Sequence, residues 1–237
     1  DDSRLMRKLL STKEDEIDVG MAGTVMRFFT AYFSLEEDRE VVLKGAERMH
    51  ERPIGSLVDA LEQLGAEISY LGKVGYPPLQ IKGKTLKGSS IEIDASSSSQ
   101  YVTAILLIAP YLTKGLDLKL LKPTSKPYID MTVNLMAKCG IECLQKHDQI
   151  QVMEGIYHLD KEYRIEADWS SAAFFYQYFA LSELSELKIA GLQEESLQGD
   201  RKCVDYFERL GVKTHFKNDH IVLRKMSFPK LSLEIDM

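Results

Sequence analysis

The residues of this sequence best suited to chemistry are small hydroxyl side chains at the start of an apolar helix. The stretch Asp94-Ala95-Ser96-Ser97-Ser98-Ser99-Gln100 follows a short alternating strand and precedes the apolar run 101–109. The first N–H groups of a helix have no intrahelical partner and carry partial positive charge. Small side chains let an anion approach these groups closely. The stretch predicts a phosphate or carboxylate site, although a Ser-rich linker or an ordinary N-cap explains the same residues.

Two further apolar helices are expected to begin with small or hydroxyl residues, at Ala22-Gly23-Thr24 and at Ser170-Ser171. Each follows a predicted short strand, so the three helix N-termini are expected to face a common mouth. Gly23 suggests close backbone approach by a ligand. Arg27 lies one helical turn deeper, where a surface position or a structural ion pair is the commoner role. Asp168, just before Ser170, is more simply an N-cap than a catalytic acid.

Charged and aromatic residues precede two amphipathic helices. Arg48-Met49-His50-Glu51-Arg52-Pro53 places two arginines before a helix whose first turn carries proline. A solvated charge cluster and a bidentate anion site explain this stretch equally well. Ser125-Lys126-Pro127-Tyr128 opens the equivalent helix further on, and Tyr128 is either an aromatic at the edge of the core or a platform for a ring. The single tryptophan, Trp169, is more simply a packing residue.

The composition excludes several classes of function. A net charge of −6 over 237 residues argues against a broad nucleic-acid surface, although a local basic pocket for a small anion remains compatible with it. Cys139, Cys143 and Cys203 show neither CxxC spacing nor an even count, which favours free thiols in a reducing compartment. The five histidines are scattered and show no close ligand pairing, so no metal site is expected. The apolar run 101–112 is too short to span a bilayer and no signal peptide opens the chain, so a cytoplasmic location is expected.

An internal repeat organises the chain. Gly65 and Gly140 are 75 residues apart and Gly140 and Gly211 are 71 apart, and each is a suitable helix C-cap. The first predicted copy has strands 16–19, 40–43, 67–71 and 79–82, with helices 23–35 and 54–64. The second has strands 91–94, 116–120, 141–145 and 149–153, with the Ser-opened helix and one ending at Gly140. The third has strands 163–166, 187–190, 212–216 and 220–224, with helix 170–182 and one ending at Gly211.

The two helix types predict how each βαβαββ unit packs. An amphipathic helix covers one face of a sheet, whereas a helix that is apolar all round must be enclosed. Alternating strands indicate sheets with one face in water. We therefore expect an α/β (α+β) fold of repeated βαβαββ units, with the three apolar helices enclosed by the sheets. Residues 1–10 predict an amphipathic helix that ends a unit whose beginning is absent, and 231–235 predict the first strand of another unit.

Six blocks of residues, in order across nearly the whole chain, resemble the 5-enolpyruvylshikimate-3-phosphate synthase family. They are Gly23-Thr24-x-Met26-Arg27, Glu51-Arg52-Pro53-Ile54-Gly55-x-Leu57-Val58-Asp59-Ala60-Leu61, Gly75-Tyr76-Pro77-Pro78-Leu79, Ser98-Ser99-Gln100, Ser125-Lys126-Pro127-Tyr128-Ile129-Asp130 and Gln198-Gly199-Asp200. The Arg-Pro-Ile-Gly and Ser-Lys-Pro-Tyr-Ile-Asp blocks are specific to this family. The sister enolpyruvyl transferases that act on UDP-N-acetylglucosamine share the fold but not these blocks.

The resemblance implies an inside-out α/β barrel in two lobes of three units each, which close around the substrates. It implies transfer of the carboxyvinyl (enolpyruvyl) group of phosphoenolpyruvate to the 5-hydroxyl of shikimate 3-phosphate, in chorismate and aromatic amino-acid biosynthesis. The reaction would proceed through a tetrahedral intermediate and eliminate phosphate, without metal or cofactor. Residues 1–165, with units 16–82 and 91–153, would form a substrate-binding lobe, and 166–237 would begin the second lobe. Only small-molecule partners and a monomer are expected.

The resemblance also implies roles for individual residues. The residues that would hold shikimate 3-phosphate are Ser98, Ser99, Gln100, Ser125 and Tyr128, the tyrosine ring lying against the cyclohexene. Those that would face phosphoenolpyruvate are Gly23, Arg52 and Gln100, with Arg52 pairing with an anionic group. Supporting roles would fall to Thr24, Arg27, Lys126 and Asp168.

Departures from the family pattern limit what the chain is expected to do alone. Met21 stands where asparagine is common, and Trp169 stands where a small residue is usual. The N-terminal lysine-bearing segment has no counterpart, and the acid/base residues of the second lobe would follow Met237. No catalytic residue is identified within the chain, and little or no turnover is expected.

Three other interpretations remain open. The chain could be a non-catalytic module that binds shikimate 3-phosphate, the sister transferase with a nucleotide-sugar acceptor, or a structural repeat array without a ligand.

Overall fold

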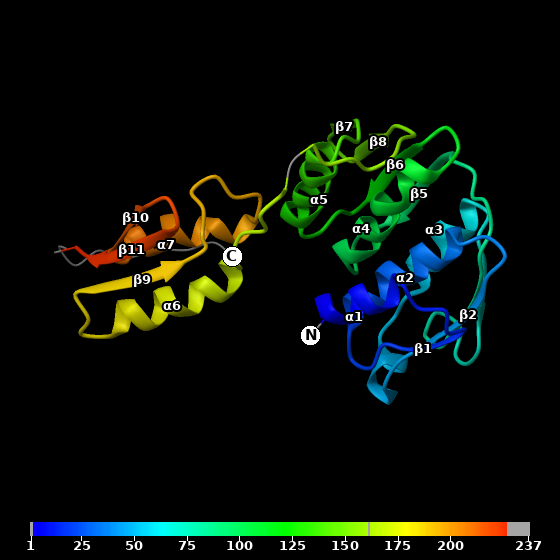
Figure 1. Ribbon diagram of the computed structural model, residues 1–237, viewed down its shortest axis with the longest axis horizontal. Helices are drawn as coiled ribbons and strands as arrows, with labels where there is room; N and C mark the ends of the chain where they lie inside the picture. Colours follow the sequence, from blue (N-terminus) through cyan, green and yellow to red (C-terminus); the bar gives the residue numbers. More distant parts are fainter. Residues whose placement is uncertain (1, 161, 227–237) are drawn as a thin grey trace. The chain divides into compact units, whose positions relative to one another are not determined.

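The computed structural model describes residues 2–160 and 162–226. The chain divides into two compact units, Asp1–Asp160 (unit 1) and Lys161–Met237 (unit 2), whose elements are labelled in Figure 1. The strand expected at 231–235 lies outside the described residues. Across the described ranges, no helix has the length and apolar character needed to cross a membrane.

Unit 1 contains two four-stranded sheets with the same strand order. The first runs β1 (Glu16–Asp18), β2 (Glu40–Lys44), β4 (Leu79–Lys82), β3 (Glu67–Tyr70), and the second runs β5 (Ser90–Asp94), β6 (Leu116–Leu121), β8 (Gln149–Val152), β7 (Cys143–Lys146). In each sheet the first two strands are parallel and the other neighbours are antiparallel. The predicted repeat is therefore confirmed for these two copies, and no strand end differs from the prediction by more than two residues.

The helices of unit 1 follow the strands in the predicted order. They are α1 (Asp2–Leu9), α2 (Gly23–Leu35), α3 (Gly55–Gln63), α4 (Ser99–Ile108) and α5 (Lys126–Lys138), with short 3₁₀ turns η1 (Glu47–Glu51) and η2 (Ala109–Tyr111). Gly65 and Gly140, which follow α3 and α5, have φ values of +94° and +83°. Glycine adopts this left-handed conformation without the steric penalty that a Cβ would bring, so it ends a helix cleanly. The two predicted glycine stops are confirmed.

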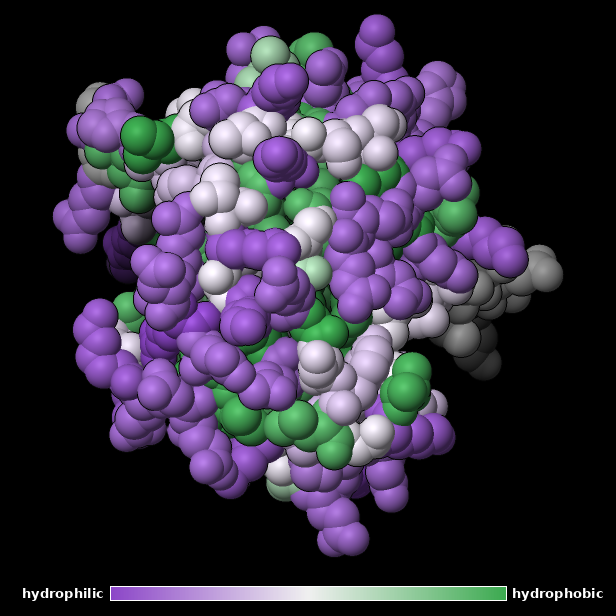
Figure 2. Space-filling model, turned by 90° about the vertical axis from the view of Figure 1, so that its right-hand side faces the viewer, coloured by the Kyte–Doolittle hydropathy of each residue, from purple (hydrophilic) through white to green (hydrophobic). Residues whose placement is uncertain are grey.

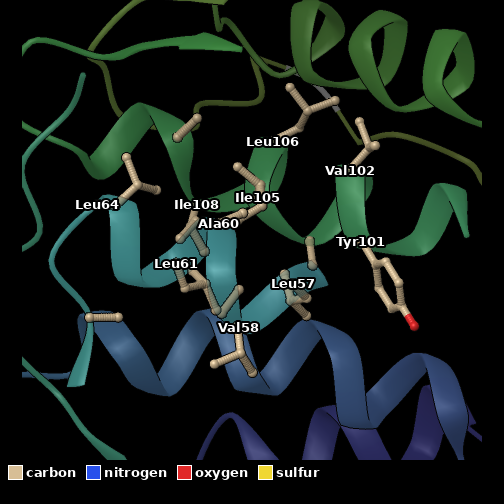
Figure 3. Packing of buried hydrophobic residues seen from close by; sticks show 14 of the residues in the cluster. Leu57, Val58, Ala60, Leu61, Leu64, Tyr101, Val102, Ile105, Leu106 and Ile108 are labelled. Carbon is tan, nitrogen blue, oxygen red and sulfur yellow. The ribbon is translucent and has the colours of Figure 1, made fainter. Parts of the chain in front are cut away.

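Apolar helices occupy the interior of unit 1. α2 packs against α4, and α4 packs against α3 and α5. Figure 3 shows buried side chains of α3, such as Leu57 and Leu61, meeting those of α4, such as Ile105. Burial of one such side chain contributes about 1.5–3 kcal/mol. The face of the molecule in Figure 2 is mainly hydrophilic, with hydrophobic residues scattered over it. The expectation that α2 and α4 are enclosed is confirmed.

Unit 2 contains a smaller version of the same arrangement. Its sheet runs β10 (Val212–Phe216), β11 (His220–Lys225), β9 (Glu186–Ala190), and its helices are α6 (Trp169–Leu181), α7 (Cys203–Arg209) and the 3₁₀ turn η3 (Gly199–Lys202). The strand expected at 163–166 is wrong, because these residues form no strand. Ile165 is 83% exposed, and an alternating segment gains little from joining a sheet when its apolar side chain stays in water.

The expectation that α6 is enclosed is also wrong in part. Trp169, Tyr176 and Phe179 of α6 are fully buried, whereas Phe174 is 73% and Leu181 is 82% exposed. η3, α7 and strands β10 and β11 contact α6, and large side chains of α6 such as Phe174 and Tyr178 remain exposed. The composition of α6 is apolar as expected, but enclosure depends on neighbours that the sequence of the helix does not specify.

Candidate anion-binding site

Two loops of unit 1 leave the same edge of a sheet. β5 and β6 are parallel, and their last residues, Asp94 and Leu121, lie opposite each other. The serine run that follows β5 and the loop that follows β6 therefore start side by side. The hydroxyl of Thr124 donates a hydrogen bond of 2.9 Å to the carbonyl of Ala95 and ties the two loops together. The two bonded residues are 29 positions apart in the sequence, and the sheet brings their loops into contact.

A pocket of about 380 Å³ opens between these loops and the end of η1. Its lining residues are Arg52, Ser97, Ser98, Ser99, Gln100, Thr124, Ser125 and Tyr128. Six of them are residues for which the family resemblance implies a role in substrate binding. The other two, Ser97 and Thr124, were not in the predicted set, although Ser97 belongs to the same serine run and Thr124 directly precedes Ser125.

A second hollow in unit 1 is larger but chemically unsuited to an anion. It has a volume of about 520 Å³ and lies among α1, α2 and α4, with side chains such as Phe28, Tyr32 and Leu107. Its charged lining residues are the two glutamates Glu36 and Glu37. Carboxylates repel an anionic ligand, so the smaller, more polar pocket is the better candidate for a functional site.

The start of α4 confirms the N-cap interpretation of the serine run. Ser98 has an extended backbone, and its hydroxyl oxygen accepts a hydrogen bond of 3.2 Å from the N–H of Gln100. A hydroxyl that accepts through its oxygen still has its own O–H to donate. Ser98 can therefore cap the helix and donate to an anionic oxygen in the pocket at the same time.

Ser125 and Tyr128 approach the pocket from the start of α5. Ser125 has φ +53° and ψ +42°, a left-handed conformation that is uncommon outside glycine, and its hydroxyl makes no capping bond to α5. Tyr128 is 50% exposed and lines the pocket instead of filling the core. Lys126 does not line the pocket, because its amine pairs with Asp130 at 2.6 Å along α5.

Two guanidinium groups meet at the first residue of α2. A Cβ added to Gly23 would lie 2.3 Å from Nη1 of Arg52 and 2.6 Å from Nη1 of Arg27. The N-cap residue Ala22 has no side chain that could cap the helix. Among residues 2–160 and 162–226, no carboxylate forms an ion pair with either arginine. Two cations beside an uncapped helix N-terminus create a positive potential that favours binding of an anion from outside the chain.

Arg27 lies on the buried side of this site. It is 4% exposed, so its expected role as a surface or ion-pairing residue is wrong. Its Nη1 donates to the carbonyl of Gly23 at 2.8 Å and its Nη2 to the carbonyl of Pro53 at 3.4 Å. Burial lowers the pKa of Arg27, Tyr101 opposes this shift, and the nearby charge of Arg52 lowers the pKa further. Burial thus disfavours the positive charge of Arg27, and a bound anion nearby would offset that energetic cost.

A side-chain hydrogen bond joins the N-termini of α2 and α4. Nε2 of Gln100 donates to the hydroxyl oxygen of Thr24 at 3.1 Å. The expectation that the N-termini of the apolar helices lie close together is therefore confirmed for these two helices of unit 1. Within the described residues, no group of three or more His, Cys, Asp or Glu side chains is arranged to hold a metal ion.

The N-terminus of α6, in unit 2, is closed by its own chain. Asp168 accepts hydrogen bonds from the N–H groups of Ser170 at 3.0 Å and Ser171 at 3.1 Å. The hydroxyl of Ser171 also donates to this carboxylate, and this bond is the main reason that the pKa of Asp168 is lowered. The N-cap role of Asp168 is confirmed, and so is the packing role of the fully buried Trp169.

Fold and site together define an α/β repeat protein with a cationic pocket at the N-termini of its inner helices. Residues 2–237 match the family model described as EPSP synthase (3-phosphoshikimate 1-carboxyvinyltransferase), and the chain belongs to this family. The fold is the inside-out α/β fold of that family. It is shared with the solved EPSP synthase from Acinetobacter baumannii, with a TM-score of 0.75 at 21% identity over 90% of this chain and 49% of that chain.

Curated relatives carry the same name. A Bacteroides fragilis protein named 3-phosphoshikimate 1-carboxyvinyltransferase is 42% identical over 227 residues, which are 95% of this chain and 55% of the relative. A Yersinia ruckeri protein of the same name is 40% identical over 216 residues, which are 90% of this chain and 50% of the relative. The chain thus spans about half the length of the curated relatives it matches.

Proposed function

We propose that the chain takes part in transfer of the carboxyvinyl group of phosphoenolpyruvate to the 5-hydroxyl of shikimate 3-phosphate. In this proposal the pocket of unit 1 binds shikimate 3-phosphate, and the arginines at the start of α2 face phosphoenolpyruvate. A two-lobed organisation with its boundary near residue 165, a cytoplasmic location and a monomeric state belong to the same proposal.

One observation carries the proposal. Arg52, Ser98, Gln100, Ser125 and Tyr128 come from three separate stretches of the chain and line one pocket. The pocket offers hydroxyl and amide donors for a phosphate, an aromatic wall for a six-membered ring, and a guanidinium for a second anion. Shikimate 3-phosphate and phosphoenolpyruvate together present this combination of groups.

The chemistry expected of the site is electrostatic. Arginine and the free N–H groups of α2 stabilise the anionic groups of phosphoenolpyruvate and the charge that develops as phosphate leaves. The guanidinium fork can bind a carboxylate or phosphate through two hydrogen bonds. Ser98, Ser99 and Ser125 would donate to the phosphate of the acceptor, and Tyr128 would fix the orientation of its ring. Reactant positioning of this kind lowers the entropic barrier of a two-substrate reaction.

The proposal is tested by binding of each substrate to the 237-residue chain. Calorimetric titration is expected to detect shikimate 3-phosphate, and phosphoenolpyruvate is then titrated in the presence of the first ligand. UDP-N-acetylglucosamine serves as the alternative acceptor and is expected not to bind. Binding of the nucleotide sugar in place of shikimate 3-phosphate would contradict the proposal and favour the sister transferase.

Turnover is a separate measurement. Phosphate release from both substrates, measured in steady state, is expected to be little or none for this chain alone. Binding of shikimate 3-phosphate without turnover is therefore the expected result, and steady-state turnover by this chain alone would contradict it.

A further inference from the structure

We propose that Tyr101 is a positioning residue for the site, and that its hydroxyl holds Arg52 in place beside Gly23 through the carbonyl of Pro53. The inference rests on the proposed function for its consequence, which is binding of phosphoenolpyruvate. Tyr101 itself lines no part of the pocket and would touch neither substrate.

The contact that carries the inference is a short hydrogen bond between distant segments. Tyr101 lies in the first turn of α4 and is 2% exposed, and its hydroxyl donates to the carbonyl of Pro53 at 2.5 Å. Figure 3 shows the ring at the edge of the apolar cluster, with its hydroxyl pointing away from the other labelled side chains. The ring therefore belongs to the core, while the hydroxyl reaches the segment that carries Arg52.

The backbone at Pro53 transmits this contact to Arg52. The proline ring fixes its own φ and restricts the preceding residue to extended conformations. Arg52 accordingly has φ −93° and ψ +119°. On the other side, the N–H of Ile54 donates to the carbonyl of Gly75 at 2.9 Å. The carbonyl of Pro53 and the Cα of Arg52 are thus joined by a stiff link, so anchoring the one determines where the arginine side chain begins.

Few other contacts could replace the Tyr101 hydroxyl. The carbonyl of Pro53 also accepts from Nη2 of Arg27, but that hydrogen bond is long at 3.4 Å. Arg27 in turn lies 5.9 Å from the centre of the Tyr101 ring. Without the hydroxyl, the carbonyl of Pro53 would keep only this weak donor, and the exposed side chain of Arg52 would be held less firmly beside Gly23.

The direct test of positioning uses the Arg52 side chain as a reporter. Tyr101→Phe removes only the hydroxyl and keeps the ring. The matched control is Tyr157→Phe, because the Tyr157 hydroxyl also donates to a backbone carbonyl, that of Leu107 at 3.0 Å, away from the pocket. The Nε–Hε NMR signal of Arg52, assigned by its loss in Arg52→Lys, is expected to shift or broaden in Tyr101→Phe and to stay unchanged in Tyr157→Phe.

The functional test compares the two ligands of the site. Tyr101→Phe is expected to weaken binding of phosphoenolpyruvate about five- to tenfold, as loss of one hydrogen bond to the positioning segment implies. It is expected to leave the affinity for shikimate 3-phosphate within twofold of the unaltered chain. In an Arg52→Ala background the same substitution should have no further effect on phosphoenolpyruvate, because the group that it positions is gone.

The outcomes separate the inference from the proposed function. An unchanged Arg52 signal in Tyr101→Phe overturns the inference, and so does an equal loss of affinity in the presence and absence of the Arg52 guanidinium. A shifted Arg52 signal in a chain that binds no phosphoenolpyruvate supports positioning and overturns the proposed function. Equal weakening of both ligands in Tyr101→Phe and Tyr157→Phe would show a general loss of structure and overturn the inference.

Discussion

Two helix N-termini in this chain have cap residues with similar φ angles and opposite chemistry. The cap residue of α2, Ala22, has φ −76° and ψ +83°, and the cap residue of α6, Asp168, has φ −79° and ψ +116°. Asp168 satisfies the first N–H groups of α6 with its own carboxylate. α2 has no side-chain cap, and two arginines lie against its first residue. The comparison teaches that a repeated scaffold can use one helix end for stability and leave its equivalent open for a ligand.

The largest effect is expected from closing the open site with a methyl group. In Gly23→Ala the new Cβ would lie 2.3 Å from Nη1 of Arg52, so the guanidinium must move. The exposed Arg52 side chain can move away, but the buried Arg27, whose Nη1 would lie 2.6 Å from the new Cβ, must also shift. We expect an affinity for phosphoenolpyruvate at least about tenfold lower, measured by calorimetry, with a somewhat lower unfolding midpoint.

Gly55→Ala is the matched control for this substitution. Gly55 is the first residue of α3, and a Cβ there would find its nearest neighbour at 3.5 Å, which is ordinary contact. Equal losses of affinity in Gly23→Ala and Gly55→Ala would mean that crowding of Arg52 is not the cause.

The difference between the two N-termini can also be tested by giving α2 an aspartate cap like that of α6. Ala22→Asp places a carboxylate at the N-terminus of α2, where it would accept from the free N–H groups and attract both arginines. We expect the free energy of unfolding to rise by up to about 1 kcal/mol and the affinity for phosphoenolpyruvate to fall about fivefold. Denaturant unfolding and calorimetry measure the two effects. Ala22→Asn, which caps without the charge, is expected to weaken binding less.

Removal of the α6 cap is expected to affect stability alone. Asp168→Ala leaves two N–H groups of α6 without their acceptor and should lower the free energy of unfolding of unit 2 by about 1 kcal/mol. Hydrogen exchange of the first turn of α6 measures the loss locally. Asp168→Asn, whose amide oxygen can still accept, should retain most of the protection, and an equal loss in both variants would point to the charge instead of the cap.

The smallest effect is a pH dependence of α6. The pKa of Asp168 is lowered below its ordinary value of 3.8, chiefly by the hydroxyl of Ser171. Its contribution to stability is therefore complete above that ordinary value and is lost as the pH falls through the lowered pKa. We expect protection of the first turn of α6 to decline below about pH 4, and Asp168→Asn to remove this decline. A decline of equal size in Asp168→Asn would assign it to other groups.

Local features of the chain were predictable from its sequence. The helix expected at 23–35 was found at Gly23–Leu35, and the glycine stops at Gly65, Gly140 and Gly211 all have positive φ. Apolar periodicity and glycine conformation act over a few residues, so sequence reports them directly. The grouping of the serine run with Ser125 was expected from a resemblance, and the parallel pairing of β5 and β6 gives its physical cause.

Features that depend on distant partners were not predictable in the same way. Tyr101 and Pro53 are 48 residues apart, and the local sequence of neither segment predicts their hydrogen bond. Arg27 was expected at the surface or in an ion pair, but α4 and the Pro53 segment bury it. The missing strand at 163–166 and the exposed side of α6 have the same origin, because burial of an apolar segment requires a neighbour that its own sequence does not encode.

The measurement that tests the central claim most directly is a calorimetric titration of shikimate 3-phosphate into the 237-residue chain, with shikimate as the ligand that lacks the phosphate. We expect binding of the phosphorylated ligand, with an affinity at least about tenfold lower for shikimate. Gln100→Ala and Tyr128→Phe should each weaken binding, because both side chains line the pocket. Absence of binding, or equal affinity for both ligands in the unaltered chain and both variants, would contradict an anion site in this pocket.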